Sequence, residues 1–401
     1  MKHSIIGGIS ALALTAFAWS ASAESIVLGA AVSASGKYST AGLHTMNGYN
    51  MAVDLINAGG GVNVGGTIYT LEIKYYDDES TPARGAELAE RLISQDGVKF
   101  LLGPYSSGLT KAIAPVTEKH GVPMVEANGA SRSLFTNNYR YLFAVLSTSE
   151  QYLTTAVAFA AELAVEAGRE ASSVKIAMAF ENDPFSQDTR AGIIDDAAKF
   201  GMEIIIDDKL PKDLNDMTPT LTKVRVLKPD LLVVSGHSKG AITAIRQINE
   251  MNIYVPMLAI THCESANIIE KFGAGADNTL CAAQWSETLT YEDDLFGTAA
   301  EFSVAFEALY GYVPPYQAAE SAAAVMVFAD AFARAGSLDQ DAVRDALAAT
   351  DMQTFYGNIL FDETGKNIAK PMILRQIQNG EYKVVAPSEW AEIGIIHPRP
   401  R

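Results

Sequence analysis

The stretch VKIAMAFENDPFSQDTRAGIIDDAAKFGMEIII, residues 174–206, decides the fold. An apolar run over Val174–Ala179 leads into a helical pattern over Pro184–Phe200, and a second apolar run follows at Glu203–Ile206. Asp183 marks the helix start, because its carboxylate can cap the first turn and the proline after it lacks only an N–H that would stay unpaired there. Strand, helix and strand in this order predict two parallel strands joined by a crossover helix.

The same alternation extends in both directions from this stretch. Before it, we expect strand Ser25–Val32, helix Ala41–Asn57, strand Tyr69–Asp77, helix Pro82–Gln95, strand Val98–Leu102, helix Gly108–His120, strand Val122–Val125 and helix Glu150–Ala167. After it, we expect helix Asp216–Lys228, strand Leu231–Ser235, helix Ala241–Met251 and strand Pro256–Ile260. The pattern stops at 136–145 and then restarts. The sequence therefore predicts an α/β protein with two doubly wound, parallel-sheet lobes.

The last part of the chain has a different character. It contains helical patterns over Phe296–Tyr310, Tyr316–Ala335 and Gln340–Ala349, followed by short strand-like pieces at Gly357–Phe361, Met372–Gln378 and Tyr382–Val385. A late helical segment after two lobes predicts three crossings, near residues 144, 286 and 355, which together form a hinge. The N-terminal lobe is then 24–144 with 287–354, and the C-terminal lobe is 145–286 with 355–401.

The first residues read as a cleaved secretory signal. Lys2 precedes a short apolar run, Ile5–Trp19, and Ala21-Ser22-Ala23 supplies the small residues of a cleavage site. The run is shorter than the roughly 20 apolar residues of a membrane span. We expect cleavage after Ala23 and a mature protein that is free in the periplasm, without a lipid anchor because no cysteine follows the cleavage site.

The net charge and the two cysteines limit the classes of partner and cofactor that we expect. The formal net charge is −17 at pH 7, which repels nucleic acid and anionic membrane surfaces but leaves open a local pocket of opposite sign. The two cysteines, Cys263 and Cys281, have no metal-ligand spacing, and no cofactor or metal is predicted. An oxidising compartment favours a bridge between neighbouring strands; two buried free thiols are the alternative.

Two motifs resemble functional loops, one catalytic and one nucleotide-binding. Gly236-His237-Ser238-Lys239-Gly240 matches G-x-S-x-G between a predicted strand and a predicted helix, as a serine hydrolase requires. The pattern is short, and strand–glycine–helix turns are common in doubly wound folds. The segment 103–108 has the glycine spacing of a phosphate-binding loop, but Leu109-Thr110 stands where that loop needs lysine, so nucleotide binding is rejected.

The loops that follow predicted strands carry polar, aromatic and small side chains from both lobes. In open α/β sheets, ligands bind outside the carboxyl ends of the strands. Hydroxyls and free N–H groups at the start of the helix near Gly108 suit a carboxylate. The candidate ligand-binding residues on these loops are Tyr105, Ser106, Ser107, Asn128, Gly129, Ala130, Ser131, Phe185, His237, His262 and Glu264.

Several fragments, in their order and spacing, give the chain a family resemblance. They are Ile26-Val27-Leu28-Gly29, Ser35-Gly36, Ile56-Asn57-Ala58-Gly59-Gly60-Gly61, Tyr76-Asp77-Asp78, Leu102-Gly103-Pro104-Tyr105-Ser106-Ser107 and Lys228-Pro229-Asp230. Over nearly all of its mature length the chain resembles the type I periplasmic binding proteins, the branch with the leucine/isoleucine/valine-binding protein and related amino-acid and amide receptors. The resemblance implies a Venus-flytrap fold that serves ABC permease subunits in the inner membrane.

The resemblance also implies roles for single residues. Ser107 falls where the family binds the ligand carboxylate, and Asn128 and Ala130 lie on the loop whose backbone contacts the ligand's polar end. Phe185 and His237 fall at tyrosine positions that cover the ligand from the second lobe. Tyr316 matches an aromatic residue at the start of a late helix.

The family pattern is not complete. Ala130 replaces a threonine that grips the carboxylate and the ammonium, although Ser131 is adjacent. The glutamate that neutralises an α-ammonium falls near Thr261 or His262, and Glu264 serves only if the loop is shifted. An unpaired buried ammonium is costly.

We therefore expect the monomeric substrate-binding component of an ABC importer, with no enzymatic activity. Its solute is a small carboxylate of amino-acid or amide type, held in the interlobe cleft by hinge closure. The alternatives are an aromatic carboxylate in the same role or, from a different class, a secreted hydrolase using Ser238.

Overall fold

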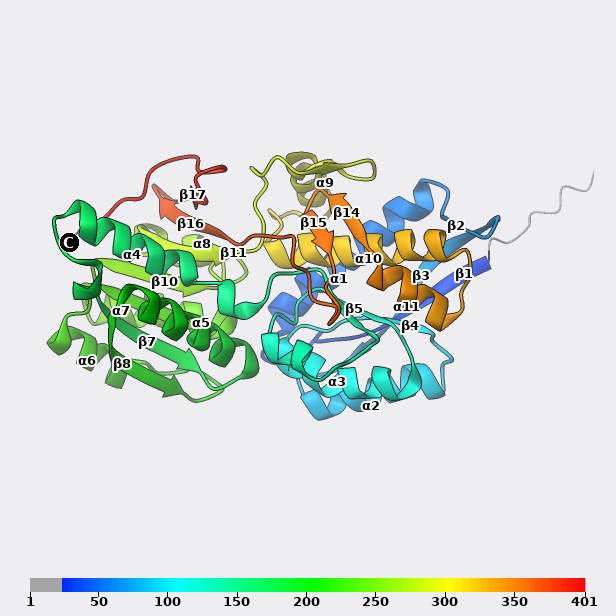
Figure 1. Ribbon diagram of the computed structural model, residues 1–401, viewed down its shortest axis with the longest axis horizontal. Coiled ribbons are helices and arrows are strands. Elements are labelled where there is room, and N and C mark those ends of the chain that lie inside the picture. Colours follow the sequence, from blue (N-terminus) through cyan, green and yellow to red (C-terminus); the bar gives the residue numbers. More distant parts are fainter. Residues whose placement is uncertain (1–23, 401) are drawn as a thin grey trace, which may run out of the picture.

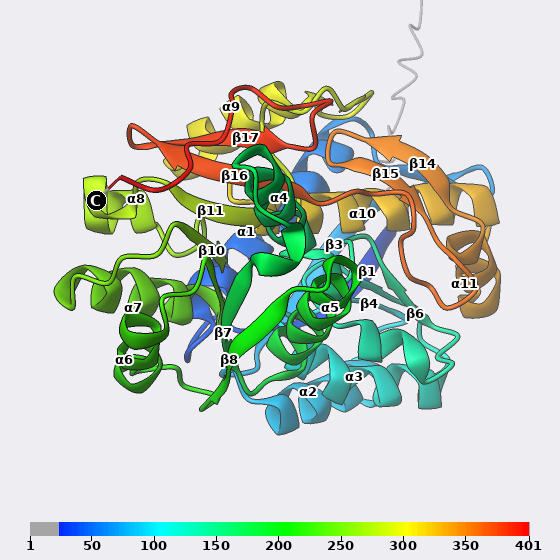
Figure 2. The same ribbon diagram turned by 60° about the vertical axis from the view of Figure 1, so that its left-hand side comes forward.

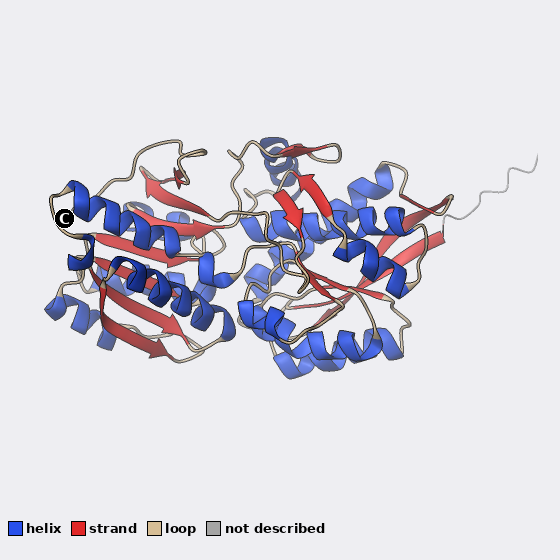
Figure 3. Ribbon diagram, in the orientation of Figure 1, coloured by secondary structure: helices blue, strands red, loops and turns tan. Residues whose placement is uncertain are grey.

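The computed structural model describes residues 24–400 and shows two α/β lobes joined by crossing chain segments (Figure 1). Each lobe has a twisted central sheet with helices on both faces (Figure 3). The predicted fold class is confirmed. The predicted signal peptide, residues 1–23, lies outside the described residues.

The N-terminal lobe is built on a six-stranded sheet with helices from both ends of the chain. Its elements are β1 (Glu24–Val32), α1 (Ser39–Ala58), β2 (Val62–Val64), β3 (Thr67–Asp77), α2 (Pro82–Ser94), β4 (Phe100–Leu102), α3 (Ser107–His120), β5 (Met124–Glu126), β6 (Leu142–Ala144), α9 (Ala299–Tyr310), α10 (Tyr316–Ala335), α11 (Gln340–Ala348), β14 (Asp351–Thr354) and β15 (Gly357–Leu360). The strand order is β2-β3-β1-β4-β5-β6, parallel except for β2. Helices α1 and α10 pack together on one face, and α2 and α3 on the other (Figure 1).

The C-terminal lobe has a seven-stranded sheet. Its elements are α4 (Thr154–Glu166), β7 (Lys175–Glu181), α5 (Pro184–Phe200), β8 (Glu203–Leu210), α6 (Thr218–Leu227), β9 (Leu231–Ser235), α7 (His237–Glu250), β10 (Met257–Thr261), α8 (Ile268–Phe272), β11 (Thr279–Ala283), β16 (Ile373–Gln378) and β17 (Glu381–Ala386). The order is β17-β16-β11-β10-β9-β7-β8, in which β16 and β17 are antiparallel additions. Figure 2 shows α4 and α5 on one face and α6 and α7 on the other.

Local chemistry sets the limits of the elements. The Asp183 carboxylate accepts a hydrogen bond from the N–H of Ser186, as the capping prediction requires, and Gly201 ends α5 at a φ of 67°. Strands β9, β10 and β11 are buried along their whole length, which is why they contain almost only apolar residues. A small hairpin, β12 (Glu292–Asp293) with β13 (Gly297–Thr298), precedes α9.

Strand order fixes where a ligand can enter. In the N-terminal sheet the direction of winding reverses between β1 and β4, and in the C-terminal sheet it reverses between β7 and β9. Loops on either side of such a reversal separate and leave a crevice at the carboxyl ends of the strands. These loops bring residues from both lobes to one interlobe region.

Three segments cross between the lobes and are tied together. Gln284 Oε1 accepts from the N–H of Ser147 at 3.1 Å, and Gln284 Nε2 donates to the carbonyl of Ser147 at 2.8 Å. The Ser147 hydroxyl donates to the carbonyl of Lys370 at 2.6 Å. Because Lys366 still pairs with Ala144 of β6, the third crossing lies beyond 366, later than the expected position near 355.

Among the described residues, no single helix combines the length and the apolar composition of a membrane span. Helices α10 and α11 pass that test only as a pair, and they are bent by 113° relative to each other. The interior of α10 belongs to the core of the N-terminal lobe.

Cys263 and Cys281 form a disulfide, with a Cα–Cα distance of 5.8 Å and a sequence separation of 18. The predicted bridge is therefore present in the structure. It joins the segment just after β10 to β11, where both cysteines are buried.

Replacing both residues (Cys263→Ala with Cys281→Ala) should lower the free energy of unfolding by about 2–4 kcal/mol, because the bridge restricts the unfolded chain over a loop of this length. Urea unfolding of the variant and of the wild type, with and without reductant, measures the change. If reductant lowered the stability of the variant as much as that of the wild type, the loss would not come from the bridge.

Candidate functional site

The candidate site is a cluster of aromatic side chains between the lobes, which we call the aromatic chamber. His262 lies at its centre, with its ring centroid 5.0 Å from those of His237 and Phe185. It is 6.3 Å from the ring of Tyr105 and 6.4 Å from that of Tyr316. All five side chains were predicted from sequence and all are buried. The structure thus brings the predicted aromatic residues of both lobes together.

Two further aromatic residues that the sequence analysis missed complete the chamber. The ring of Tyr38, in the loop after β1, lies 5.3 Å from that of Tyr105 and 4.9 Å from that of His237. Tyr152, just past the first crossing, lies 4.9 Å from Phe185. The position of Tyr38 after the first predicted strand is a usable signal, because ligands in open α/β sheets bind at the loops that follow the strands.

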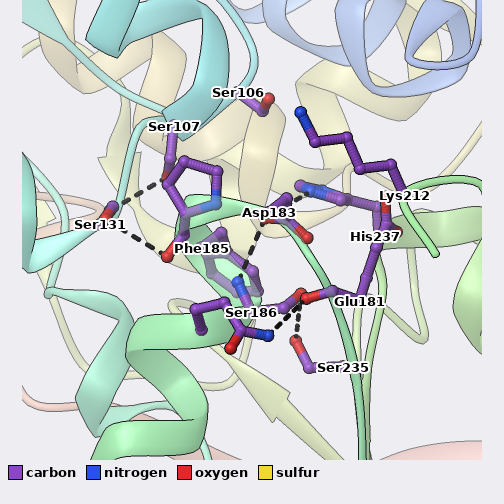
Figure 4. A network of polar contacts seen from close by, with 12 residues as sticks. Ser106, Ser107, Ser131, Glu181, Asp183, Phe185, Ser186, Lys212, Ser235 and His237 are labelled. Carbon is purple, nitrogen blue, oxygen red and sulfur yellow. Dashed lines mark hydrogen bonds and ion pairs between the residues drawn. The ribbon is translucent and has the colours of Figure 1, made fainter. Parts of the chain in front are cut away.

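A charged network fixes His237 against the opposite lobe. Its Nδ1 is 2.8 Å from the hydroxyl of Tyr105, and its Nε2 is 3.5 Å from Asp183 Oδ1. Burial acts to raise the pKa of Asp183, but His237 and the bonds from Ser186 outweigh it and hold that pKa below its ordinary value. Asp183 is therefore a carboxylate whose Oδ1 is bonded to Ser186 and faces His237, whereas its Oδ2 has no partner among the described residues (Figure 4).

Glu126 shapes the second predicted loop. Its carboxylate accepts from the N–H groups of Asn128 at 2.5 Å and Gly129 at 2.7 Å, and from the hydroxyl of Thr110 at 2.7 Å. Burial raises the pKa of Glu126 to about 7, although these bonds favour the charged form. A side chain at Gly129 would meet Thr110 at 2.4 Å, so glycine is required for this close approach.

The predicted serines lie beside this loop. Ser107 begins α3 and its Oγ accepts from the N–H of Ser131 at 3.0 Å, so the proton of its hydroxyl is left to donate. Ser106 is buried beside the side chain of Tyr38. Ala130 is buried too, and its carbonyl accepts from the N–H of Ser149 at 2.7 Å.

Buried polar atoms without partners occur on both sides of the chamber. Within residues 24–400, Asn128 Oδ1 and His262 Nδ1 have no hydrogen-bond partner, and neither do both amide atoms of Gln317, next to Tyr316. Burial holds the pKa of His262 well below its ordinary value, so its ring is neutral near pH 7. An unsatisfied buried polar atom costs about 1–3 kcal/mol, so these atoms require a partner when the lobes are closed.

Two histidines of the chamber have unusual backbone conformations. His237 has a φ of 52° and His262 a φ of 63°, in the left-handed region that favours glycine. Such strain concentrates at binding sites, where it fixes the direction of a side chain. Here it brings two imidazoles from adjacent strand ends together, with their ring centroids 5.0 Å apart.

Glu264 is the exception among the predicted residues. Its Oε1 is 2.8 Å from Arg375 Nη1, and its carboxylate also accepts from the backbone N–H of Tyr316. The carboxylate is therefore committed to a buried cation, and its bonds connect it to the edge of the chamber only through the backbone of Tyr316.

The G-x-S-x-G motif has a structural explanation. Side chains at Gly236 and Gly240 would meet Leu214 at 2.7 Å and 2.8 Å, so both glycines allow that leucine to pack. Among the described residues, the Ser238 hydroxyl hydrogen-bonds that of Ser265 at 2.9 Å and pairs with no histidine. The geometry gives no support to a hydrolase that uses Ser238.

Comparison with known proteins identifies the family. The family model described as "Periplasmic binding protein" matches residues 25–381. The chain belongs to this family. The Leu/Ile/Val-binding protein homolog 8 of Brucella suis is 24% identical to this binding protein, and the match covers 98% of each chain.

Two solved structures are similar in fold. The branched-chain amino acid substrate-binding protein LivJ from Streptococcus pneumoniae, in complex with isoleucine, matches with a TM-score of 0.78 at 23% identity and covers 91% of this binding protein and 100% of its own chain. An ABC-transporter solute-binding protein from R. palustris, in complex with benzoate, matches with a TM-score of 0.76 at 19% identity and covers 90% and 96%. The resemblance drawn from the sequence is confirmed.

The lobes of this binding protein are closed on each other. Lys37 of the N-terminal lobe is 3.1 Å from Glu181 Oε1 at the end of β7. Ser131 hydrogen-bonds Asp188 of α5, and the N–H of Ser133 donates to the same carboxylate at 3.1 Å. Figure 4 shows Ser131 between Ser107 on its own lobe and the start of α5 on the other.

Replacing Glu126 by Gln should flatten the pH dependence of stability. The pKa of Glu126 in the folded protein is about 7, above its ordinary value of 4.5. Ionisation of Glu126 therefore destabilises the wild type progressively as pH rises from the lower to the higher of these values, by roughly 3 kcal/mol once the group is fully charged. The wild type, relative to Glu126→Gln, should therefore lose stability between about pH 5 and about pH 8. Urea unfolding at both pH values measures this; a constant difference between the two proteins would show that Glu126 titrates normally.

Proposed function

We propose that this protein is the solute-binding component of an ABC importer, and that its lobes close on a small carboxylate-bearing solute in the aromatic chamber. The unpartnered polar atoms carry the proposal. Asn128 Oδ1 belongs to the N-terminal lobe and His262 Nδ1 to the C-terminal lobe. A solute that bridges the lobes satisfies both atoms only when they are closed, so binding shifts the population toward the closed state. Export to the periplasm through residues 1–23 belongs to the same proposal.

A carboxylate fits the N-terminal side of the chamber. Helix α3 starts at Ser107, and its first N–H groups are unpaired within the helix and lie at its positive end. The free proton of the Ser107 hydroxyl and the neighbouring hydroxyl of Ser106 add donors at the same place. Water is excluded here, which strengthens each of these interactions.

The α-ammonium of an amino acid has fewer partners among the described residues. Glu264 is paired with Arg375 and Glu126 holds its own loop, so the free carboxylate oxygen is Oδ2 of Asp183, a residue that already interacts with His237. The neutral ring of His262 lies at the centre of the chamber instead. Because a buried ammonium would have to share the Asp183 carboxylate with His237, we favour a carboxylate with an aromatic or amide body over an α-amino acid. The benzoate and isoleucine complexes of the two similar structures represent these alternatives.

Replacing Ser107 by Ala should weaken solute binding about tenfold, the loss of one hydrogen bond to a charged group. The solute is first selected by a thermal-shift screen of amino acids, amides and aromatic acids, since a ligand of the native state raises its melting temperature. Calorimetric titration then compares Ser107→Ala with Ser172→Ala, which changes an exposed serine far from the chamber. Unchanged affinity in Ser107→Ala would remove Ser107 from the site, and a screen in which no carboxylate binds would overturn the proposed function.

A further inference from the structure

A second space adjoins the chamber at the contact between the lobes. A cavity of about 240 Å³ is lined by Lys37, Tyr38 and Tyr105 from the N-terminal lobe. Lys212 and His237 are among the residues that line it from the C-terminal lobe. Both lobes form its wall, so it exists in this shape only when they are closed.

The cavity and the aromatic chamber share a boundary. Tyr105 and His237 line the cavity, and their rings also belong to the chamber. The contact between them is a single hydrogen bond of 2.8 Å from side chain to side chain. A solute held in the chamber therefore reaches the cavity if its far end extends along this tyrosine–histidine pair.

The cavity is locally positive on an acidic protein. It is lined by the three lysines Lys37, Lys212 and Lys239 and by the two acids Glu181 and Asp213, whereas the whole chain has a formal net charge of −17 at pH 7.

Lys37 already has its partners, because its ammonium contacts Glu181 at 3.1 Å and the carbonyl of Lys212 at 3.0 Å. Within residues 24–400, the ammonium groups of Lys212 and Lys239 form no ion pair. Figure 4 shows Lys212 and His237, which line the same cavity.

We propose that the solute is a dicarboxylate, with one carboxylate at the start of α3 and the other in this cavity beside Lys212 and Lys239. The inference rests on the proposed function and names its solute class. A second carboxylate finds there two exposed cations that form no ion pair among the described residues, whereas an apolar end would be placed beside charged groups. The aromatic side chains between the two ends contact the body of the solute.

The test compares acids that differ only at the far end. Terephthalate and adipate are each titrated against their own monoamide by calorimetry, using the mature wild-type protein and the double variant Lys212→Gln/Lys239→Gln. The control variant, Lys99→Gln/Lys209→Gln, removes two exposed lysines outside the cavity and changes the net charge equally.

We expect at least one dicarboxylate to bind about tenfold more tightly than its monoamide in the wild type and in the control variant. The double variant should lose this preference and keep its affinity for the monoamide. Equal affinity of diacid and monoamide in the wild type would overturn the dicarboxylate assignment, and so would an equal loss of the preference in the control variant. Binding of either acid would still leave the proposed function intact. Binding of amino acids alone in the thermal-shift screen would overturn the dicarboxylate assignment only, whereas a screen in which no carboxylate binds would overturn both.

Discussion

The hydrogen bonds between Gln284, Ser147 and Lys370 hold three crossing segments in one bundle, and the rest of the site depends on that bundle. Two sheets joined by a single linker would present their strand ends in any relative direction. Three tied segments restrict the lobes to opening and closing about one region. Whenever the lobes close, the carboxyl ends of β1 and β4 therefore face those of β7 and β9, and loops that are far apart in the sequence meet at the same place.

Closure without a solute leaves a defined energetic deficit. The closed lobes gain the Lys37–Glu181 pair and the bonds of Ser131 and Ser133 to Asp188, most of them near the surface of the cleft. In this closed arrangement Asn128 Oδ1 and His262 Nδ1 are buried without partners. Contacts at the edge thus favour closing, and desolvated groups at the centre oppose it. A solute that satisfies the central groups removes the opposing term, which is how a receptor can remain responsive although its lobes already attract each other.

The sequence predicted what depends on local pattern. Strands such as Leu231–Ser235 are short apolar runs, and the loops after them carried His237 and His262, because parallel strands end at one edge. It missed β11, Thr-Leu-Cys-Ala-Ala, since only one large apolar side chain marks it and its burial comes from neighbouring strands. It began α7 too late, because the polar residues from His237 read as a loop. The contact of Tyr38 with His237 was beyond reach for another reason: it forms only when two lobes close.

The backbone strain at His237 and His262 indicates that the site depends on their imidazole side chains. Glycine would adopt the left-handed backbone of residue 237 or 262 with less strain than histidine does. The cost of that conformation is therefore offset by the interactions of the imidazole side chains. His237 joins Tyr105 to Asp183 and so links the lobes through one ring. His262 is buried and uncharged, and it presents a polar atom with no formal charge at the centre of the chamber. Shape alone would admit many small solutes into such an aromatic space. Under the proposed function, an uncharged His262 between the donors at the start of α3 and the lysines Lys212 and Lys239 would select by charge, favouring anionic ends over a buried cation.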